Sequence, residues 1–299
     1  MKKIILPLLA AVGCGGISTS ALAASGNWTS TTGGDWTDTA KWDPAAVPGG
    51  NGTAVNLNAD FTTGSKTINL NADAIVGTMI FGDSNATGPS ALTALTLSGA
   101  NTLFFNNSGS NATLTWQGAA TNKISSAIKL DDNLVVSGVN TTGGFQGAIS
   151  SNSPGEKTIY INSYSVFSGS ISDGTGVVGL NRVASTALFL SGDNTFSGGV
   201  NLNSTTAQLS LGHENALGTG TLSIGTGSSV IVNVTSSNAI AKNLSFGGGQ
   251  LTGSGNLTIE AMTIRATGSI INRLGDTLIT GPVYLSENAT ASRGLRRRQ

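Results

Sequence analysis

Few side chains in this sequence could do acid–base chemistry, and they are scattered. His213 is the only histidine, and it stands beside Glu214 in the stretch Gly-His-Glu-Asn at residues 212–215. A single histidine excludes a multi-histidine metal site, and a His-Glu pair next to glycine is more typical of a loop than of an acid–base couple. Asp131 and Asp132 are adjacent, so on a strand they would point to opposite faces, and we expect a solvated turn. We therefore expect no catalytic residue, no metal site and no cofactor.

Three of the four tryptophans form the second group with chemical potential. Trp28, Trp36 and Trp42 lie within fifteen residues and precede a Val-Pro-Gly-Gly-Asn turn at residues 47–51. An exposed indole can stack on the apolar face of a sugar ring, so carbohydrate stacking is one interpretation. The other is a cap over residues 24–52, because bulky aromatic residues can close the open end of a stacked-strand fold. We favour the cap.

The elements that would position these residues are short strands in a repeated motif. Residues 188–199 read Leu-Phe-Leu-Ser-Gly-Asp-Asn-Thr-Phe-Ser-Gly-Gly, and related stretches start at Leu95, Leu134 and Tyr160. Apolar residues at every second position predict a strand with one buried side, and we expect Gly192 and Asn194 to accept positive φ at a turn. One short strand cannot bury its apolar side alone, but stacked coils can. The motif residues are Leu188, Leu190, Ser191, Gly192, Asn194, Thr195, Phe196, Ser197, Gly198 and Gly199.

This motif resembles the autotransporter-associated β-strand repeat, a passenger-type module of secreted bacterial surface proteins. The family consensus looks like Leu-x-Leu-Ser-Gly-x-Asn-Thr-Tyr/Phe-Ser-Gly-Gly-Thr, and residues 188–199 match it, with Val200 in place of the final Thr. The stretch at residues 215–224 is similar to the segment that usually follows. The resemblance implies an all-β fold, a right-handed parallel β-helix.

Composition favours the same fold independently. The chain of 299 residues has 42 glycines, 38% hydrophobic residues and only 10% charged residues. Neutral Asn, Thr and Ser side chains can form hydrogen-bonded ladders between coils, and hydrophobic residues in alternating phase argue against a disordered chain. We expect the β-helix to occupy residues 53–285 in roughly ten coils of about 20–25 residues. Residues 119–130 suggest at most a turn or two of helix.

The first 23 residues have the pattern of a secretory signal peptide. Lys2 and Lys3 precede a short apolar segment, and Ala-Leu-Ala at residues 21–23 predicts cleavage between Ala23 and Ala24. The only cysteine, Cys14, lies inside this segment, so the mature chain would contain none; lipidation at Cys14 is the alternative. The sequence contains no run of 18 apolar residues, so it predicts no transmembrane helix. We expect export to the cell surface or the medium.

Charge is unevenly distributed. Residues 24–292 contain nine basic and fifteen acidic residues. Four arginines lie in the tail at residues 286–299, which we expect to be disordered. A mildly acidic body argues against a nucleic-acid partner. The tail also resembles the basic stub of a sorting signal without its apolar part, which would fit a truncated product.

Two functions remain open on these observations. The first is a structural or adhesin-like repeat protein that contacts a polysaccharide or a cell-surface matrix, with the oligomeric state undecided. The alternative is a secreted β-helix enzyme, a lyase or hydrolase, that acts on a polysaccharide. Such an enzyme needs several carboxylates with Lys, Arg or His on one face of neighbouring coils.

The processing prediction can be tested directly. We expect N-terminal sequencing of the exported protein to begin at Ala24, because Ala21 and Ala23 have the small side chains that signal peptidase subsites accept. A mature chain that begins at a lipid-modified Cys14 would contradict this and establish a lipoprotein.

Overall fold

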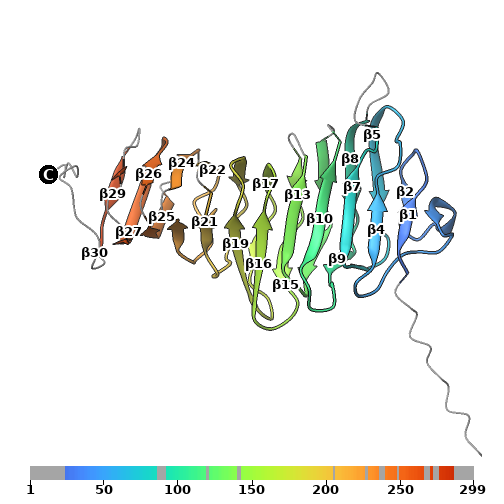
Figure 1. Ribbon diagram of the computed structural model, residues 1–299, viewed down its shortest axis with the longest axis horizontal. Coiled ribbons are helices and arrows are strands. Elements are labelled where there is room, and N and C mark those ends of the chain that lie inside the picture. The colour runs from blue at the N-terminus through green and yellow to red at the C-terminus, as the bar shows by residue number, and fades with distance from the viewer. Residues whose placement is uncertain are drawn as a thin grey trace, which may run out of the picture.

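The chain folds into a β-solenoid of about nine turns, with strands stacked side by side along one axis (Figure 1). In this computed structural model the described residues are 24–85, 92–118, 121–139, 143–204, 206–225, 228–235, 240–247, 249–265, 270–271 and 276–285. The described part contains 30 strands and one short 3-10 helix, η1 (Thr39–Lys41). The expected all-β parallel β-helix is confirmed. The signal segment and the basic tail lie outside the described residues.

Three sheets form the sides of the solenoid. The first sheet has 14 strands: β1 (Gly26–Trp28), β3 (Trp42–Asp43), β4 (Ala54–Leu57), β7 (Thr78–Gly82), β10 (Ala112–Gln117), β13 (Leu134–Gly138), β16 (Glu156–Ile161), β19 (Val177–Arg182), β21 (Val200–Leu202), β23 (Leu222–Ile224), β25 (Ile240–Phe246), β27 (Leu257–Ile264), β29 (Thr277–Ile279) and β30 (Val283–Leu285). The second has 11 strands: β2 (Gly34–Asp35), β5 (Gly64–Asn69), β8 (Leu92–Ser98), β11 (Thr121–Ile124), β14 (Gly144–Phe145), β17 (Ser165–Phe167), β20 (Ala187–Leu190), β22 (Thr206–Leu211), β24 (Ser228–Val234), β26 (Gly249–Thr252) and β28 (Ile270–Ile271). The third has five: β6 (Ala74–Val76), β9 (Thr102–Phe105), β12 (Ala127–Leu130), β15 (Ile149–Ser151) and β18 (Ile171–Ser172).

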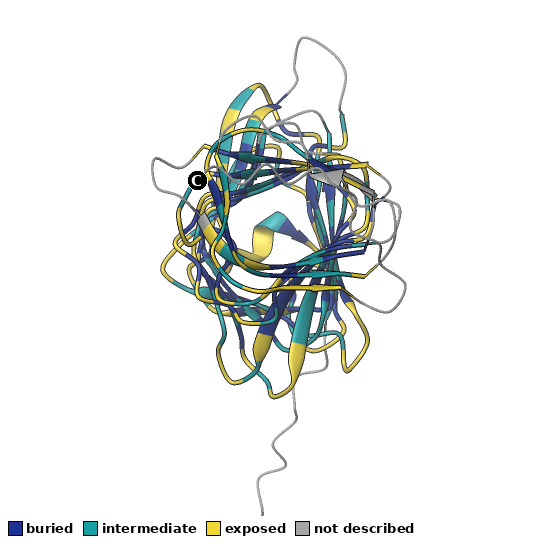
Figure 2. Cartoon of the chain, turned by 90° about the vertical axis from the view of Figure 1, so that its left-hand side faces the viewer, coloured by how far each residue is buried: buried dark blue, intermediate teal, exposed yellow. Residues whose placement is uncertain are grey.

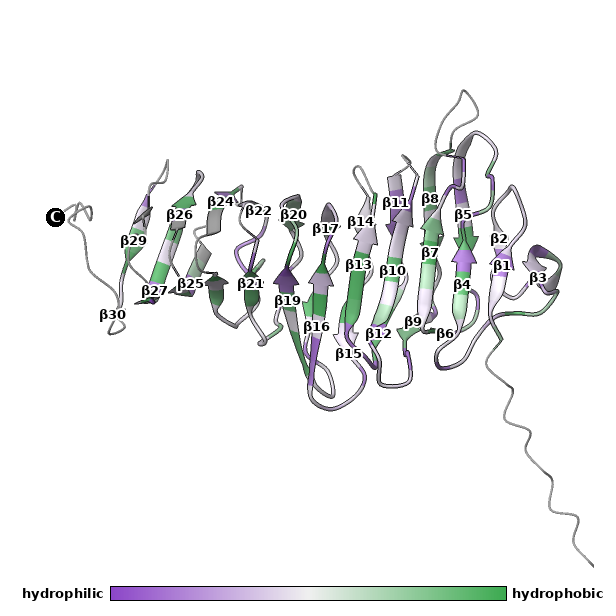
Figure 3. Cartoon of the chain, in the orientation of Figure 1, coloured by the Kyte–Doolittle hydropathy of each residue, from purple (hydrophilic) through white to green (hydrophobic). Residues whose placement is uncertain are grey.

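Parallel pairing in register aligns equivalent residues of successive turns into rows. One inward row on the second sheet runs through Ile68, Leu97, Ile124, Phe145, Phe167, Leu190, Leu211 and Val234. Every member is buried, and along the strands buried residues alternate with more exposed ones (Figure 2), while hydrophobic and hydrophilic residues alternate in the same strands (Figure 3). Each fully buried side chain of this size contributes roughly 1.5–3 kcal/mol, so the rows supply the hydrophobic core.

Three of the four tryptophans pack together at the N-terminal end of the solenoid. Trp42 makes edge-to-face contacts with Trp28 and Trp36, at ring-centroid distances of 5.1 and 5.0 Å, and its Nε1 donates to the Trp36 carbonyl oxygen at 2.8 Å. The β3 strand pairs antiparallel with β1 and ends the first sheet. All three side chains are only 1–3% exposed. The interpretation of Trp28, Trp36 and Trp42 as sugar-stacking residues is therefore wrong in its premise, because no ring face is open.

The four sequence repeats do not occupy equivalent places. The copies at Leu95 and Leu188 lie on the second sheet, whereas those at Leu134 and Tyr160 start on the first. The reason is that a turn has more than one tight corner after an apolar strand, and a glycine can be required at the corners of either sheet. For example, a Cβ on Gly138 would lie 2.0 Å from the Trp116 carbonyl oxygen of the preceding turn, and φ is +87° there.

The expectation of some helix within residues 119–130 is wrong. The described residues of this segment form β11 and β12. Ile124, Ile128 and Leu130 are buried, while Lys123 and Lys129 alternate with them on the outside. This period of two is the strand pattern, and stacking on β8 and β9 stabilises it.

Stability should depend on the inward rows. Leu190 is fully buried between Phe167 and Leu211. We expect Leu190→Asp to lower the free energy of unfolding by several kcal/mol, roughly 4 or more, because the carboxylate has no partner in the core. Asp193→Asn, at an exposed position three residues after Leu190, is the control and should stay within about 0.5 kcal/mol. An unchanged thermal melt for Leu190→Asp would contradict the inside–outside assignment.

Candidate functional site

The repeat motif runs from the second sheet round a corner to the third side of the solenoid. Burial alternates throughout it, so Leu188, Leu190, Gly192, Asn194 and Phe196 point inward. Ser191, Thr195 and Ser197 are exposed, and Gly198 and Gly199 bring the chain back toward the first sheet at β21. The motif is therefore one continuous inside–outside pattern that bends at its glycines.

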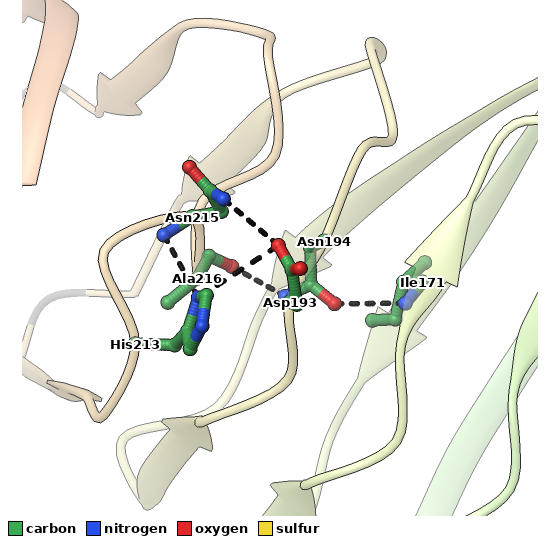
Figure 4. Close-up of polar contacts among 6 residues, drawn as sticks. All are labelled: Ile171, Asp193, Asn194, His213, Asn215 and Ala216. Carbon is green, nitrogen blue, oxygen red and sulfur yellow. Dashed lines mark hydrogen bonds and ion pairs between the residues drawn. The ribbon is translucent and has the colours of Figure 1, made fainter.

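Asn194 is a buried bridge between three turns. Its Oδ1 accepts a hydrogen bond from the Ile171 backbone N–H at 2.7 Å, and its Nδ2 donates to the Ala216 carbonyl oxygen at 2.6 Å (Figure 4). These partners lie 23 residues before and 22 residues after Asn194 in the chain. The side chain is 2% exposed, so both bonds are shielded from water.

The expected positive φ at Gly192 and Asn194 is wrong. Within the motif only Gly199 has it, at +78°. Gly192 is needed instead for close approach, because a Cβ there would lie 2.2 Å from the Gly169 carbonyl oxygen. Asn194 is needed because the third sheet ends at β18, and an amide side chain can satisfy the backbone groups that a further strand would have paired.

The only histidine lies on the outside of this corner. Asp193 Oδ1 accepts from Asn215 Nδ2 at 2.8 Å and lies 3.8 Å from His213 Nδ1 (Figure 4). His213 Nδ1 itself accepts the Asn215 backbone N–H at 3.1 Å. In an acid–base dyad the imidazole Nδ1–H donates to the carboxylate. Here the Asn215 backbone N–H donates to Nδ1, and the bonds among His213, Asp193 and Asn215 order the turn.

Asp131 and Asp132 lie in a bend between β12 and β13, where their carboxylates hold neighbouring turns. Asp131 accepts side-chain amide bonds from Asn106 at 3.2 Å and Asn152 at 2.8 Å, one turn on either side. Asp132 Oδ2 accepts the Asn107 backbone N–H at 2.6 Å. These bonds occupy the carboxylates in linking turns together.

Arg182 is a buried charged side chain that the sequence analysis did not place. It is fully buried in an inward row of the first sheet, between Ile161 and Leu202. Its guanidinium donates to the carbonyl oxygens of Ile161 at 3.0 Å and Ser163 at 2.6 Å, and to Thr186. Burial lowers its pKa to about 10. Arg182 follows Val178 and Leu180 at a spacing of two, and this spacing was the available sign that it would point inward.

The outer face of the second sheet carries an aromatic pair that the sequence analysis also missed. Tyr164 and Phe189 are partly exposed, and their ring centroids are 5.3 Å apart. Phe189 stands between the inward residues Leu188 and Leu190, so alternation could have identified it as outward-facing. Beside the pair, a shallow hollow of about 290 Å³ is lined by Ser185, Thr206, Ala207, Gln208, Ile231, Gln250 and Thr252.

Loss of the buried Asn194 hydrogen bonds should lower the free energy of unfolding more than loss of an exposed hydrogen bond between turns. We expect Asn194→Ala to reduce the free energy of unfolding by about 2–4 kcal/mol, since it leaves the Ile171 N–H and the Ala216 carbonyl oxygen buried without a partner. The matched control is Asn203→Ala, which removes an exposed amide bond to Asn181 and should cost less than about 0.5 kcal/mol. If urea titrations show that Asn194→Ala lowers the free energy of unfolding by no more than about 0.5 kcal/mol, as expected for the control, the bridge is not needed for stability.

Of the processing residues, Ala23 lies outside the described residues and Ala24 forms an isolated bridge with Gly49. Across the described ranges, no group of three or more His, Cys, Asp or Glu side chains is placed to hold a metal ion, and no helix is long and apolar enough to cross a membrane. No family model, curated protein or solved structure matches the chain.

Proposed function

We propose that this chain is an exported structural or adhesin-like repeat protein that contacts a polysaccharide or a cell-surface matrix along its length. The observation that carries the proposal is the repetition of short, neutral polar side chains from turn to turn. Asn111 and Asn133 are linked at 3.2 Å, Thr115 and Ser137 at 3.3 Å, and Asn181 and Asn203 at 3.3 Å. Repeated weak contacts of this kind add up when the ligand is itself a repeating polymer.

The titratable groups support a non-catalytic role. His213, Asp131 and Asp132 are engaged in bonds that order turns, on different corners of the solenoid. Enzymes gather perturbed titratable groups in one pocket, whereas an adhesive rod spreads neutral groups over a surface. Export is supported by the charged, apolar and small-residue regions of the first 23 residues.

Binding and cleavage can be separated in one experiment. Purified protein is mixed with a panel of neutral and acidic polysaccharides, and co-sedimentation and the release of new chain ends are measured. We expect co-sedimentation without cleavage. Cleavage of any polysaccharide would favour the enzyme instead. A protein that binds no polysaccharide of the panel would contradict the adhesive role.

No single titratable side chain should carry an activity. We expect His213→Ala, Glu214→Ala, Asp131→Asn and Asp132→Asn each to leave polysaccharide binding within about twofold of the parent, because surface contacts of this kind are individually weak. Circular dichroism and a thermal melt on each variant check the fold. One substitution that abolishes turnover in a folded variant would overturn the non-catalytic proposal.

A further inference from the structure

The aromatic pair of Tyr164 and Phe189 on the second sheet does not belong to the hydrophobic core. The inward neighbours of Phe189 and Tyr164, which are Leu188, Leu190, Ser163 and Ser165, are all buried and fill the interior beneath the rings. All other ring pairs in the described part of the chain join buried rings. Tyr164 and Phe189 are therefore a partly exposed aromatic platform on the outside of the solenoid.

Polar groups continue from this platform along the solenoid axis. Register places Ala187, Gln208, Ile231 and Thr252 in one outward row, and Val166, Phe189, Ser210 and Asn233 in the row beside it. The hollow of about 290 Å³ lies on the first of these rows. With strands about 4.8 Å apart, the face from β17 to β26 is roughly 19 Å long, enough for several units of a polymer.

Two glutamines in the hollow, Gln208 and Gln250, have amide groups available for a ligand. Elsewhere on the solenoid, Gln117 and Gln146 each accept a side-chain hydrogen bond from a neighbouring turn, from Asn58 at 2.9 Å and Ser125 at 2.8 Å. Gln208 and Gln250 are exposed, and within the described part of the chain their side chains have no such bond. An amide offers both donors and acceptors, which suits hydroxyl groups.

Charge restricts the ligand class. The strands β17, β20, β22, β24 and β26 contain no Asp, Glu, Lys or Arg. An anionic polymer would find no counter-charge on these strands, whereas a neutral sugar needs only a flat apolar surface for its C–H face and hydrogen-bonding groups for its hydroxyls.

We propose that the outer face of the second sheet between β17 and β26 binds a neutral polysaccharide that lies along the solenoid axis. A sugar ring stacks on one of the two aromatic rings, Tyr164 or Phe189, whose planes are inclined at 48°, and the next units place their hydroxyls on Gln208 and Gln250 in the hollow. This inference rests on the proposed adhesive function and names its ligand class and its binding face.

The test compares matched variants of the full chain on two sets of polysaccharides. Phe189→Ser, Tyr164→Ala and Gln208→Ala are measured by affinity electrophoresis with neutral mannan, xylan and β-glucan and with anionic alginate and polygalacturonate. The control is Phe104→Ser, which removes a partly exposed, outward phenylalanine from the third sheet. We expect Phe189→Ser and Tyr164→Ala to weaken binding of a neutral polysaccharide by about tenfold or more, and Phe104→Ser to leave it within about twofold.

The outcomes separate this inference from the proposed function. The parent and all three variants could bind a neutral polysaccharide equally well while circular dichroism shows that they are folded. The adhesive function would then stand, and the proposed binding face would be wrong. Selective binding of anionic polymers, or a change of oligomeric state in Phe189→Ser with unchanged sugar binding, also overturns the inference. Gln208→Ala keeps the test decisive if an aromatic variant fails to fold, because Gln208 is exposed and contributes nothing to the core. If no polysaccharide binds the parent, the proposed function itself fails.

Discussion

The structure depends on in-register parallel pairing of each turn with the turn before it. Leu190, for instance, lies between Phe167 and Leu211, and this relation fixes the cross-turn neighbours of the other residues in the same strand. Because side chains alternate across a strand, one register decision settles which residues form the core and which form the surface. Interactions are then between nearest neighbours, so stability accumulates turn by turn.

The corners are where this pairing is hardest to maintain. The third sheet ends at β18, yet the chain continues past that side in later turns, and backbone groups there still need partners. Asn194 satisfies two of them from an inward position. Arg182 acts similarly on the first sheet, where its guanidinium binds carbonyl oxygens instead of a carboxylate. Desolvation of that cation opposes its burial, as its lowered pKa shows, and its hydrogen bonds offset part of the cost.

The surface follows from the same constraint. Once alternate residues are committed to the core, the outward rows are free to carry hydroxyls, amides and an occasional aromatic ring. On the first part of the second sheet an outward row includes Lys123, while further along it holds Val166 and Phe189. This change from charged to apolar along one row gives the later strands a chemistry that suits neutral ligands.

The sequence by itself indicated stacked strands, because apolar residues alternate, glycine is abundant and charge is low, and the resemblance of its motif to a known repeat implied the parallel β-helix. It also indicated that Asp131 and Asp132 belong to a turn. Only the tertiary structure decided which copies of the motif are equivalent, since an apolar–Ser–Gly step looks the same at different corners of a turn. It likewise decided that Asn194 and Arg182 are buried and that Tyr164 meets Phe189. Those facts depend on residues 21–25 positions apart in the chain, and local sequence does not contain the register that brings them together.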